Sequence, residues 1–267
     1  MRKTVVAGAI LAVSVVTGLV RAQCCPPKEG GCCSAQPDAA ETVDTILKKL
    51  EEKATELTSY RCKLDYVFRQ PLLESQTRQK GTLQYAKFDE RSYLRIDFRT
   101  MQQDEEAEQA YRQQFLFDGV WLWHIDYQIK NAEARQITEP NQPADAFALA
   151  SRRVPVLGFS RVEELEKQFA IELVKPAPPE TMPYHHLHMK VLPESVYKDD
   201  YVTIDFWIDR KLTLPAKVVA VTTEQDVCEI RLLEPQVNQK IDKAAFAVKV
   251  PDDFAVQTVP LERNKVQ

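Results

Sequence analysis

The spacing of apolar residues predicts an amphipathic helix followed by a half-buried strand. Between residues 39 and 60, apolar side chains recur at steps of three and four and therefore share one stripe of a helix. From residue 60 the period becomes two, as a strand with one buried face requires. The helical stripe is Val43, Ile46, Leu47, Leu50, Ala54 and Leu57, and the strand alternates through Tyr60, Cys62, Leu64, Tyr66 and Phe68.

The same alternation recurs along the chain and predicts a mainly antiparallel sheet. Because short turns join the segments, we expect order along the chain to be order in space. About ten strands would curl rather than stay flat. The expected fold class is α+β, mainly antiparallel β, with a strongly curved, unclosed barrel and helices covering its concave face. Further strands are expected at 80–88, 91–99, 169–174, 184–192, 201–209, 215–224, 226–234 and near 247–250, and helical segments near 144–151, 161–168 and 242–246.

The clearest hairpin signal is Asp118-Gly119, which lies between two apolar runs of residues 114–124. Asp-Gly favours a tight primed turn, in which both residues have positive φ. On the returning strand, Trp121 and Trp123 would share one face with Ile125 and Tyr127.

Residues 1–22 have the pattern of a cleaved secretory signal peptide. Two basic residues precede an apolar run from Val5 to Val20, and the small residue Ala22 ends the segment. A retained membrane anchor is the alternative, but the run is shorter than the roughly 20 residues that cross a bilayer. We therefore expect export to the periplasm or cell envelope, a Cys-rich segment and linker at 23–38, and a single domain at 39–267.

Four of the six cysteines lie in the segment after the predicted signal peptide. In an oxidising compartment they are disulfide candidates, and the sequence does not choose among the three possible pairings. Intermolecular pairing and a metal or redox module remain alternatives. These residues are Cys24, Cys25, Cys32 and Cys33.

Composition and charge argue against several classes of function. The chain has only seven glycines and no Gly-rich phosphate-binding loop, which excludes P-loop and Rossmann nucleotide binding. Its formal net charge is −4 and no basic run stands out, so nucleic acid is not an expected partner.

Two patterns that suggest catalysis are better explained without it. In the histidine-rich segment 184–189, strand periodicity puts His186 and His188 on one face with Lys190, and His185 on the other. A zinc site needs converging ligands, so a solvated strand face is expected. A nucleophile elbow has the pattern Gly-x-Ser-x-Gly, and the second glycine is missing after Ser160, so this serine is not expected to be a nucleophile. We expect no catalytic residue, no metal and no cofactor, and hence not an enzyme.

Several motifs occur in a recognisable order over residues 40–256. A helix leads into Ser59-Tyr60, and the hairpin Asp118-Gly119-Val-Trp-Leu122-Trp123 follows. Helical segments at 146–149 and 165–169 come next, and Asp242-x-x-x-Phe246-x-x-x-x-Pro251 closes the series. In this order the chain resembles the periplasmic outer-membrane lipoprotein carriers, the LolA-like family, with LolB and the N-terminal domain of RseB as relatives.

The resemblance implies a monomeric carrier whose apolar interior shields the acyl chains of a lipoprotein or another lipid. An inner-membrane release complex and an outer-membrane acceptor would be its partners. Family members have Arg-Pro in the turn that enters the third strand, where the Arg helps to latch the lid, whereas this chain has Lys87-Phe88-Asp89-Glu90. An RseB-like envelope sensor that acts through a membrane protein is the alternative. Such proteins carry a second domain, and only 11 residues follow Val256 here.

The strand faces suggest which side chains line the lipid site. An apolar cleft of this kind needs aromatic and aliphatic walls. The candidate lining residues are Tyr66, Phe68, Leu83, Tyr85, Leu94, Ile96, Phe98, Trp121 and Trp123.

The remaining cysteines, Cys62 and Cys228, lie on apolar strand faces. We expect two buried, unpaired thiols, because an unclosed sheet would keep their strands apart.

Overall fold

The computed structural model describes residues 41–89, 91–146, 162–175 and 183–261. These residues belong to one compact unit, Ala40–Gln267. The predicted signal peptide and the four disulfide candidates lie outside them, as does nearly all of the helix expected at 144–151. None of the helices in the described part is long and apolar enough to cross a membrane.

Helices are few in the part of the chain that the structure describes. Helix α1 covers Val43–Thr55, where the Oγ1 of the N-cap Thr42 accepts a hydrogen bond from the amide of Thr45 at 3.3 Å. It buries Ile46, Leu47 and Leu50, as the stripe predicted, but ends before Tyr60, the expected limit. The other helical segments among the described residues are α3 (Val162–Gln168), η1 (Pro71–Leu73) and η3 (Lys243–Phe246).

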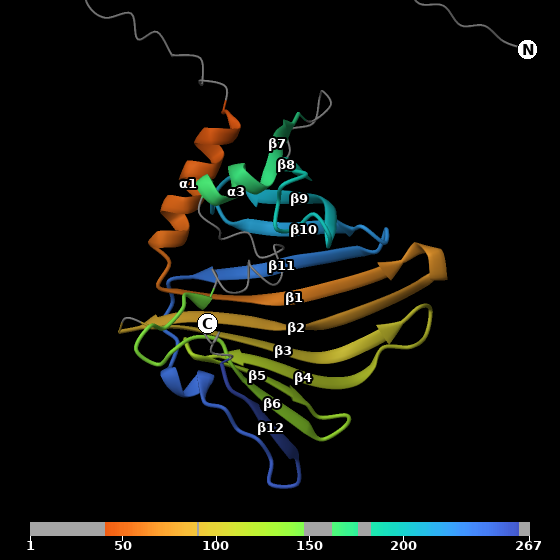
Figure 1. The fold of residues 1–267 in the computed structure, drawn as a ribbon, viewed down its shortest axis with the longest axis vertical. Coiled ribbons are helices and arrows are strands. Elements are labelled where there is room, and N and C mark those ends of the chain that lie inside the picture. The colour runs from red at the N-terminus through yellow and green to blue at the C-terminus, as the bar shows by residue number, and fades with distance from the viewer. Residues whose placement is uncertain (1–40, 90, 147–161, 176–182, 262–267) are drawn as a thin grey trace, which may run out of the picture. The chain divides into compact units, whose positions relative to one another are not determined.

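Twelve strands form one sheet (Figure 1), in the order β12-β6-β5-β4-β3-β2-β1-β11-β10-β9-β8-β7. Every pair is antiparallel except β12 and β6, and the two edges, β12 and β7, do not pair, so the sheet is unclosed. The strands are β1 (Ser59–Gln70), β2 (Ser75–Phe88), β3 (Arg91–Gln103), β4 (Gln109–Phe117), β5 (Trp121–Asp126), β6 (Asn131–Gln136), β7 (Phe169–Val174), β8 (Tyr184–Val191), β9 (Tyr201–Asp209), β10 (Pro215–Thr222), β11 (Val227–Val237) and β12 (Ala255–Val259).

The predicted class of fold is confirmed, but the expected strand order is wrong. Strand β1 lies in the middle of the sheet, between β2 and β11, and β6 and β7 lie far apart although they are consecutive. Strands β1 to β6 follow one another from the middle of the sheet toward one edge. Strand β7 then forms the opposite edge, and β8 to β11 follow one another back to the middle, where β11 pairs with β1. The prediction of the last strand is also wrong. Residues 247–250 are not a strand, and the last strand of the sheet is β12, which pairs with β6.

The two faces of the sheet differ, and we call them the inner and outer faces. The inner face carries Tyr60, Cys62 and Leu64 on β1, and it packs in one apolar core with α1 and α3. This core continues on both sides of β1 through Leu83, Tyr85, Leu94, Phe98, Phe117, Leu187, Met189, Ile204, Phe206, Ile208, Val218, Ala220, Ile230 and Leu232.

The outer face is polar around β1 and β11. Asp65 accepts two hydrogen bonds from Arg78, at 2.8 and 2.7 Å. Burial raises the pKa of Glu229, but hydrogen bonds from Arg69 and Arg231 outweigh this effect and lower it. The ion pairs keep these buried carboxylates charged on an otherwise solvated face.

Between β2 and β6, parts of the outer face are instead covered by residues 241–254, which we call the C-terminal segment. Ile241 and Phe246 pack with Ala86. Val248, Val250 and Phe254 then pack against Leu116, Ile125, Ala132 and Trp123. Where this segment packs, both faces of the sheet are therefore apolar.

The β4–β5 turn differs from the predicted primed turn. Only Gly119 has positive φ, at 93°, and the connection has three residues, 118–120. The Asp118 carboxylate accepts hydrogen bonds from the amides of Val120 at 2.9 Å and Trp121 at 2.7 Å. These bonds hold Asp118 in an Asx turn that does not need positive φ at this residue.

Candidate functional site

Burial on the inner face decreases along the strands, away from helix α1. On β1, Tyr60, Cys62 and Leu64 are fully buried, whereas Tyr66 and Phe68 are only half-buried. Ile96 on β3 and Phe115 on β4 are likewise half-buried. This part of the inner face retains apolar surface in contact with solvent.

Exposed apolar side chains also occur on the turns at one end of the sheet. Because the strands alternate in direction, the turns after β1, β5 and β8 all lie at the end where β1 finishes (Figure 1). These turns expose Leu72 by 75%, Leu73 by 69%, Ile129 by 71% and Val196 by 74%. We call this the open end. Val202, the second residue of β9 at this end, is 45% exposed.

The structure separates the nine sequence-predicted lining residues into two groups. Trp121 and Trp123 lie on the outer face, where Trp123 packs against Ile125 and the C-terminal segment. The inner position between them is Leu122. The other seven residues share the inner face: Tyr66, Phe68, Leu83, Tyr85, Leu94, Ile96 and Phe98.

Sequence reasoning missed several residues of this surface. Phe115 lies two residues before Phe117 and therefore on the same face of β4, and it pairs with Ile96 of β3. It could have been found from strand alternation and pairing. Leu72 and Leu73 follow Pro71 in a short turn with no periodicity. Nothing in their local pattern indicates exposure.

Polar contacts fix helix α1 over the sheet. Just before the helix, Glu41 contacts His185 of β8 (Oε2 to Nε2, 3.0 Å), and it also pairs with Arg210 at 3.3 Å. At the other end, the Nζ of Lys87 donates to the carbonyl of Thr55 at 3.5 Å. Lys87 is the last residue but one of β2, in the Lys87–Glu90 stretch that stands in place of the resembled family's Arg-Pro, and its charge suits a helix C-terminus.

The histidines of β8 contact neighbouring side chains. His186 and His188 both contact the Oδ1 of Asp205, at 2.7 and 2.9 Å, and His186 stacks on Trp207. His185 points to the opposite face, as the alternation predicted, and burial lowers its pKa. Within the described ranges, no group of three potential ligands converges on one point.

Cys62 and Cys228 are both unpaired, as expected, but for a different reason. Their strands are neighbours, and Cys228 lies opposite Phe68, six residues beyond Cys62 along β1. At about 3.3 Å per residue this offset is about 20 Å, too far for a disulfide. Cys62 is buried, whereas Cys228 is half-buried beside the hydroxyl of Tyr66.

The proteins that this chain is similar to were found by their structures, and the similarity concerns the fold alone. No family model matches the sequence, and no curated protein matches it. An uncharacterised conserved protein from Thermus thermophilus is 11% identical with a TM-score of 0.47, and the match covers 82% of this chain and 99% of that one. A LolA superfamily protein from Nitrosomonas europaea is 14% identical with a TM-score of 0.34, over 78% of this chain and 99% of that one.

A third neighbour is a two-protein complex. The match to the MucA/MucB complex of Pseudomonas aeruginosa has 14% identity and a TM-score of 0.43, and it covers 76% of this chain and 60% of that one. The structural neighbours thus include the LolA superfamily, which the sequence resembles. Because these TM-scores are below 0.5, they decide nothing about what the chain binds.

Proposed function

We propose that this protein is a soluble periplasmic carrier that binds the acyl chains of a lipoprotein or another lipid on the inner face of its sheet. The observation that carries the proposal is the half-buried apolar surface that includes Tyr66, Phe68, Ile96 and Phe115, together with the exposed leucines of the turn that follows β1. Apolar surface that remains accessible on one face of a folded domain is characteristic of a binding site.

The energetics of the cargo require such a surface. Hiding one methylene from water is worth about 0.8 kcal/mol, so one chain of roughly 15 carbons represents about 12 kcal/mol that a carrier must offset. Burial against aromatic and aliphatic side chains supplies this free energy without a charged or catalytic group. Release to an acceptor then requires a competing apolar environment, such as a membrane or a receptor, and no covalent step.

The open end suggests where the chains enter. Leu72 and Leu73 project from the β1–β2 turn, next to the half-buried end of β1. An acyl chain that enters there would meet Phe68 and Tyr66 before it reached the tightly packed core at Leu64.

Lipid mass spectrometry of the full chain, purified from its native envelope without detergent, tests the proposal. We expect acyl-bearing lipid or lipoprotein to co-purify, and the protein to take up a fluorescent fatty acid. Absence of both would contradict the proposal. Recovery of a membrane-bound signalling protein without any lipid would instead support a sensor.

A further inference from the structure

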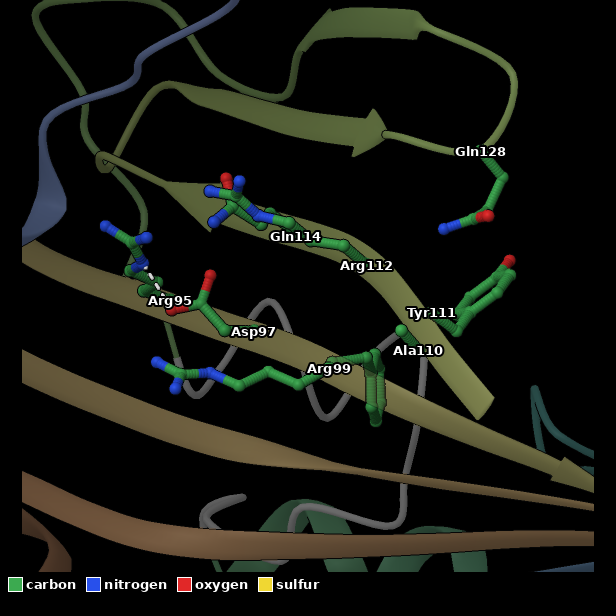
Figure 2. Close-up of a pocket in the computed structure, with 9 residues that line it drawn as sticks. Arg95, Asp97, Arg99, Ala110, Tyr111, Arg112, Gln114 and Gln128 are labelled. Atoms are coloured by element: carbon green, nitrogen blue, oxygen red, sulfur yellow. Dashed lines mark hydrogen bonds and ion pairs between the residues drawn. The ribbon is translucent and has the colours of Figure 1, made fainter. Parts of the chain in front are cut away.

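The outer face holds a cavity of about 370 Å³ that the proposed lipid site does not use. Figure 2 shows this cavity between β3 and β4, with Gln128 of the β5–β6 turn at its border. Arg95, Arg99 and Arg112 contribute three guanidinium groups to its lining, and Asp97 is the only carboxylate among its lining residues.

A β-bulge shapes the cavity. Phe98 pairs with Gln113 and Thr100 pairs with Ala110, so two residues of β4, Tyr111 and Arg112, face the single Arg99 of β3. Strict alternation would send Tyr111 and Arg112 to opposite faces, yet both line the outer cavity. Bulges redirect side chains in this way and are frequent beside functional sites.

Two of the three arginines are held in place by the surrounding structure. The Nε of Arg95 donates to Asp97 at 2.7 Å, and its Nη1 donates to the carbonyl of Ala245 at 2.7 Å. The guanidinium of Arg112 lies 3.8 Å above the ring of Tyr127, whose hydroxyl donates to Gln114 at 3.0 Å. Such prior fixation lowers the entropy lost when an arginine binds a ligand.

The charges in the cavity are not balanced by the protein. Arg95 is paired with Asp97, whereas Arg99 and Arg112 make no ion pair with any residue in the described part of the chain. Like charges on facing strands are unfavourable, and arginine stays protonated in proteins. Three guanidiniums against one carboxylate leave an excess of two positive charges in the cavity, in a chain whose formal net charge is −4.

We propose that this cavity binds a phosphate group, either on a small phosphate monoester or on a lipid headgroup. A phosphate monoester carries about −1.5 to −2 charges at pH 7, which matches the excess of two, and its oxygens suit the fork geometry of arginine. The volume is in the range of small-ligand sites. Gln128 and the ring of Tyr111 supply a hydrogen-bonding group and an aromatic wall for the rest of the ligand.

Titration calorimetry of the full chain with sn-glycerol 3-phosphate and with inorganic phosphate tests the proposal. The double variant Arg99→Gln/Arg112→Gln should bind at least about a hundredfold more weakly, since each of the two lost charged contacts is worth about 1.4 kcal/mol, or tenfold, or more. The matched control is Arg61→Gln, an exposed outer-face arginine of β1 outside this cavity, which should bind like the wild type. Thermal unfolding of all three proteins verifies that they are folded.

Sedimentation with vesicles that contain phosphatidic acid separates the two sources of phosphate. Binding of the soluble probes identifies a small ester, whereas binding only to these vesicles, and not to phosphatidylcholine vesicles, identifies a headgroup. In both cases the double variant must lose the binding. If the wild type binds none of the probes, or the folded double variant binds as well as the wild type, the proposal is wrong. Neither outcome affects the acyl-binding proposal, which concerns the other face.

Discussion

At the scale of single residues, the two thiols show how a correct expectation can rest on an incorrect reason. Periodicity placed Cys62 and Cys228 on apolar faces, and both are on the inner face. Their separation, however, follows from the register of β1 against β11, which no local pattern reveals.

The thiols are predicted to react at different rates. Burial raises the pKa of Cys62 to about 12, and it also raises the pKa of Cys228, which is only half-buried. A bulky maleimide should therefore label Cys228 slowly in the native protein and leave Cys62 unmodified until the protein unfolds. Mass spectrometry of a labelling time course, with Cys62→Ser to assign the sites, checks this prediction. Native labelling of Cys62 first would mean that the inner face has been assigned incorrectly.

A single glycine permits the close approach of β2 and β3. A Cβ on Gly81 would lie 2.0 Å from the carbonyl oxygen of Asp97, which is backbone and cannot move aside. We predict that Gly81→Ala destabilises the protein by about 3 kcal/mol or more, the upper range for overpacking. Denaturant unfolding measures the change, with the outer-face substitution Thr82→Ala as the control. Equal stability of both variants would contradict the register of this pair.

At the scale of elements, helix α1 was predictable because its stripe has a regular period and its cap is a threonine. The strand faces were predictable where one face is polar, as on β1. They were not predictable on β5, because Leu122 and Trp123 are both apolar and are covered by different elements. The polar start of β2, residues 75–80, has no apolar alternation at all and forms a strand because it pairs with β1.

The attachment of α1 should depend on pH through His185. Burial holds the pKa of this histidine below its usual 6.5, so below about pH 6.5 the unfolded chain binds a proton that the folded protein does not. Stability should therefore fall as the pH decreases from 7 to 5. The pKa of Glu41 is also lowered, chiefly by its hydrogen bond from Lys49, so its contribution is lost at still lower pH.

Thermal unfolding between pH 7 and pH 5 tests this prediction. His185→Asn should reduce the loss of stability over this range, whereas Glu41→Gln removes the carboxylate but retains the histidine and should preserve the loss. An unchanged pH dependence in His185→Asn would show that other groups control it.

At the scale of the whole molecule, the strand order follows from contacts that are distant in sequence. Short turns predicted the antiparallel runs from β1 to β6 and from β7 to β11 correctly. The pairing of β1 with β11, and the parallel addition of β12 to β6, join residues more than a hundred positions apart. Local periodicity contains no signal for either pair, so the centre of the sheet and one of its edges were missed.

Lipid binding by the whole molecule should depend on which face receives a charge. Phe68→Asp places a carboxylate on the half-buried inner surface and should weaken fatty-acid binding at least about tenfold, because burying an unpaired charge is costly. Leu233→Asp is a matched control, since Leu233 is 44% exposed on the outer face. Fluorescence titration with a fatty-acid probe measures both. Equal binding by the two variants would contradict the proposed site.

The most direct test of the central claim is to locate a bound acyl chain on the protein. A photoactivatable fatty acid, bound to the full chain and irradiated, should attach to inner-face residues such as Tyr66, Phe68, Ile96 and Phe115, and to Leu72 and Leu73 at the open end. Residue-level mass spectrometry reads out the sites. Attachment confined to outer-face residues, such as Trp121, Trp123 and Leu233, or the absence of any attachment that excess unlabelled fatty acid competes away, would contradict the account.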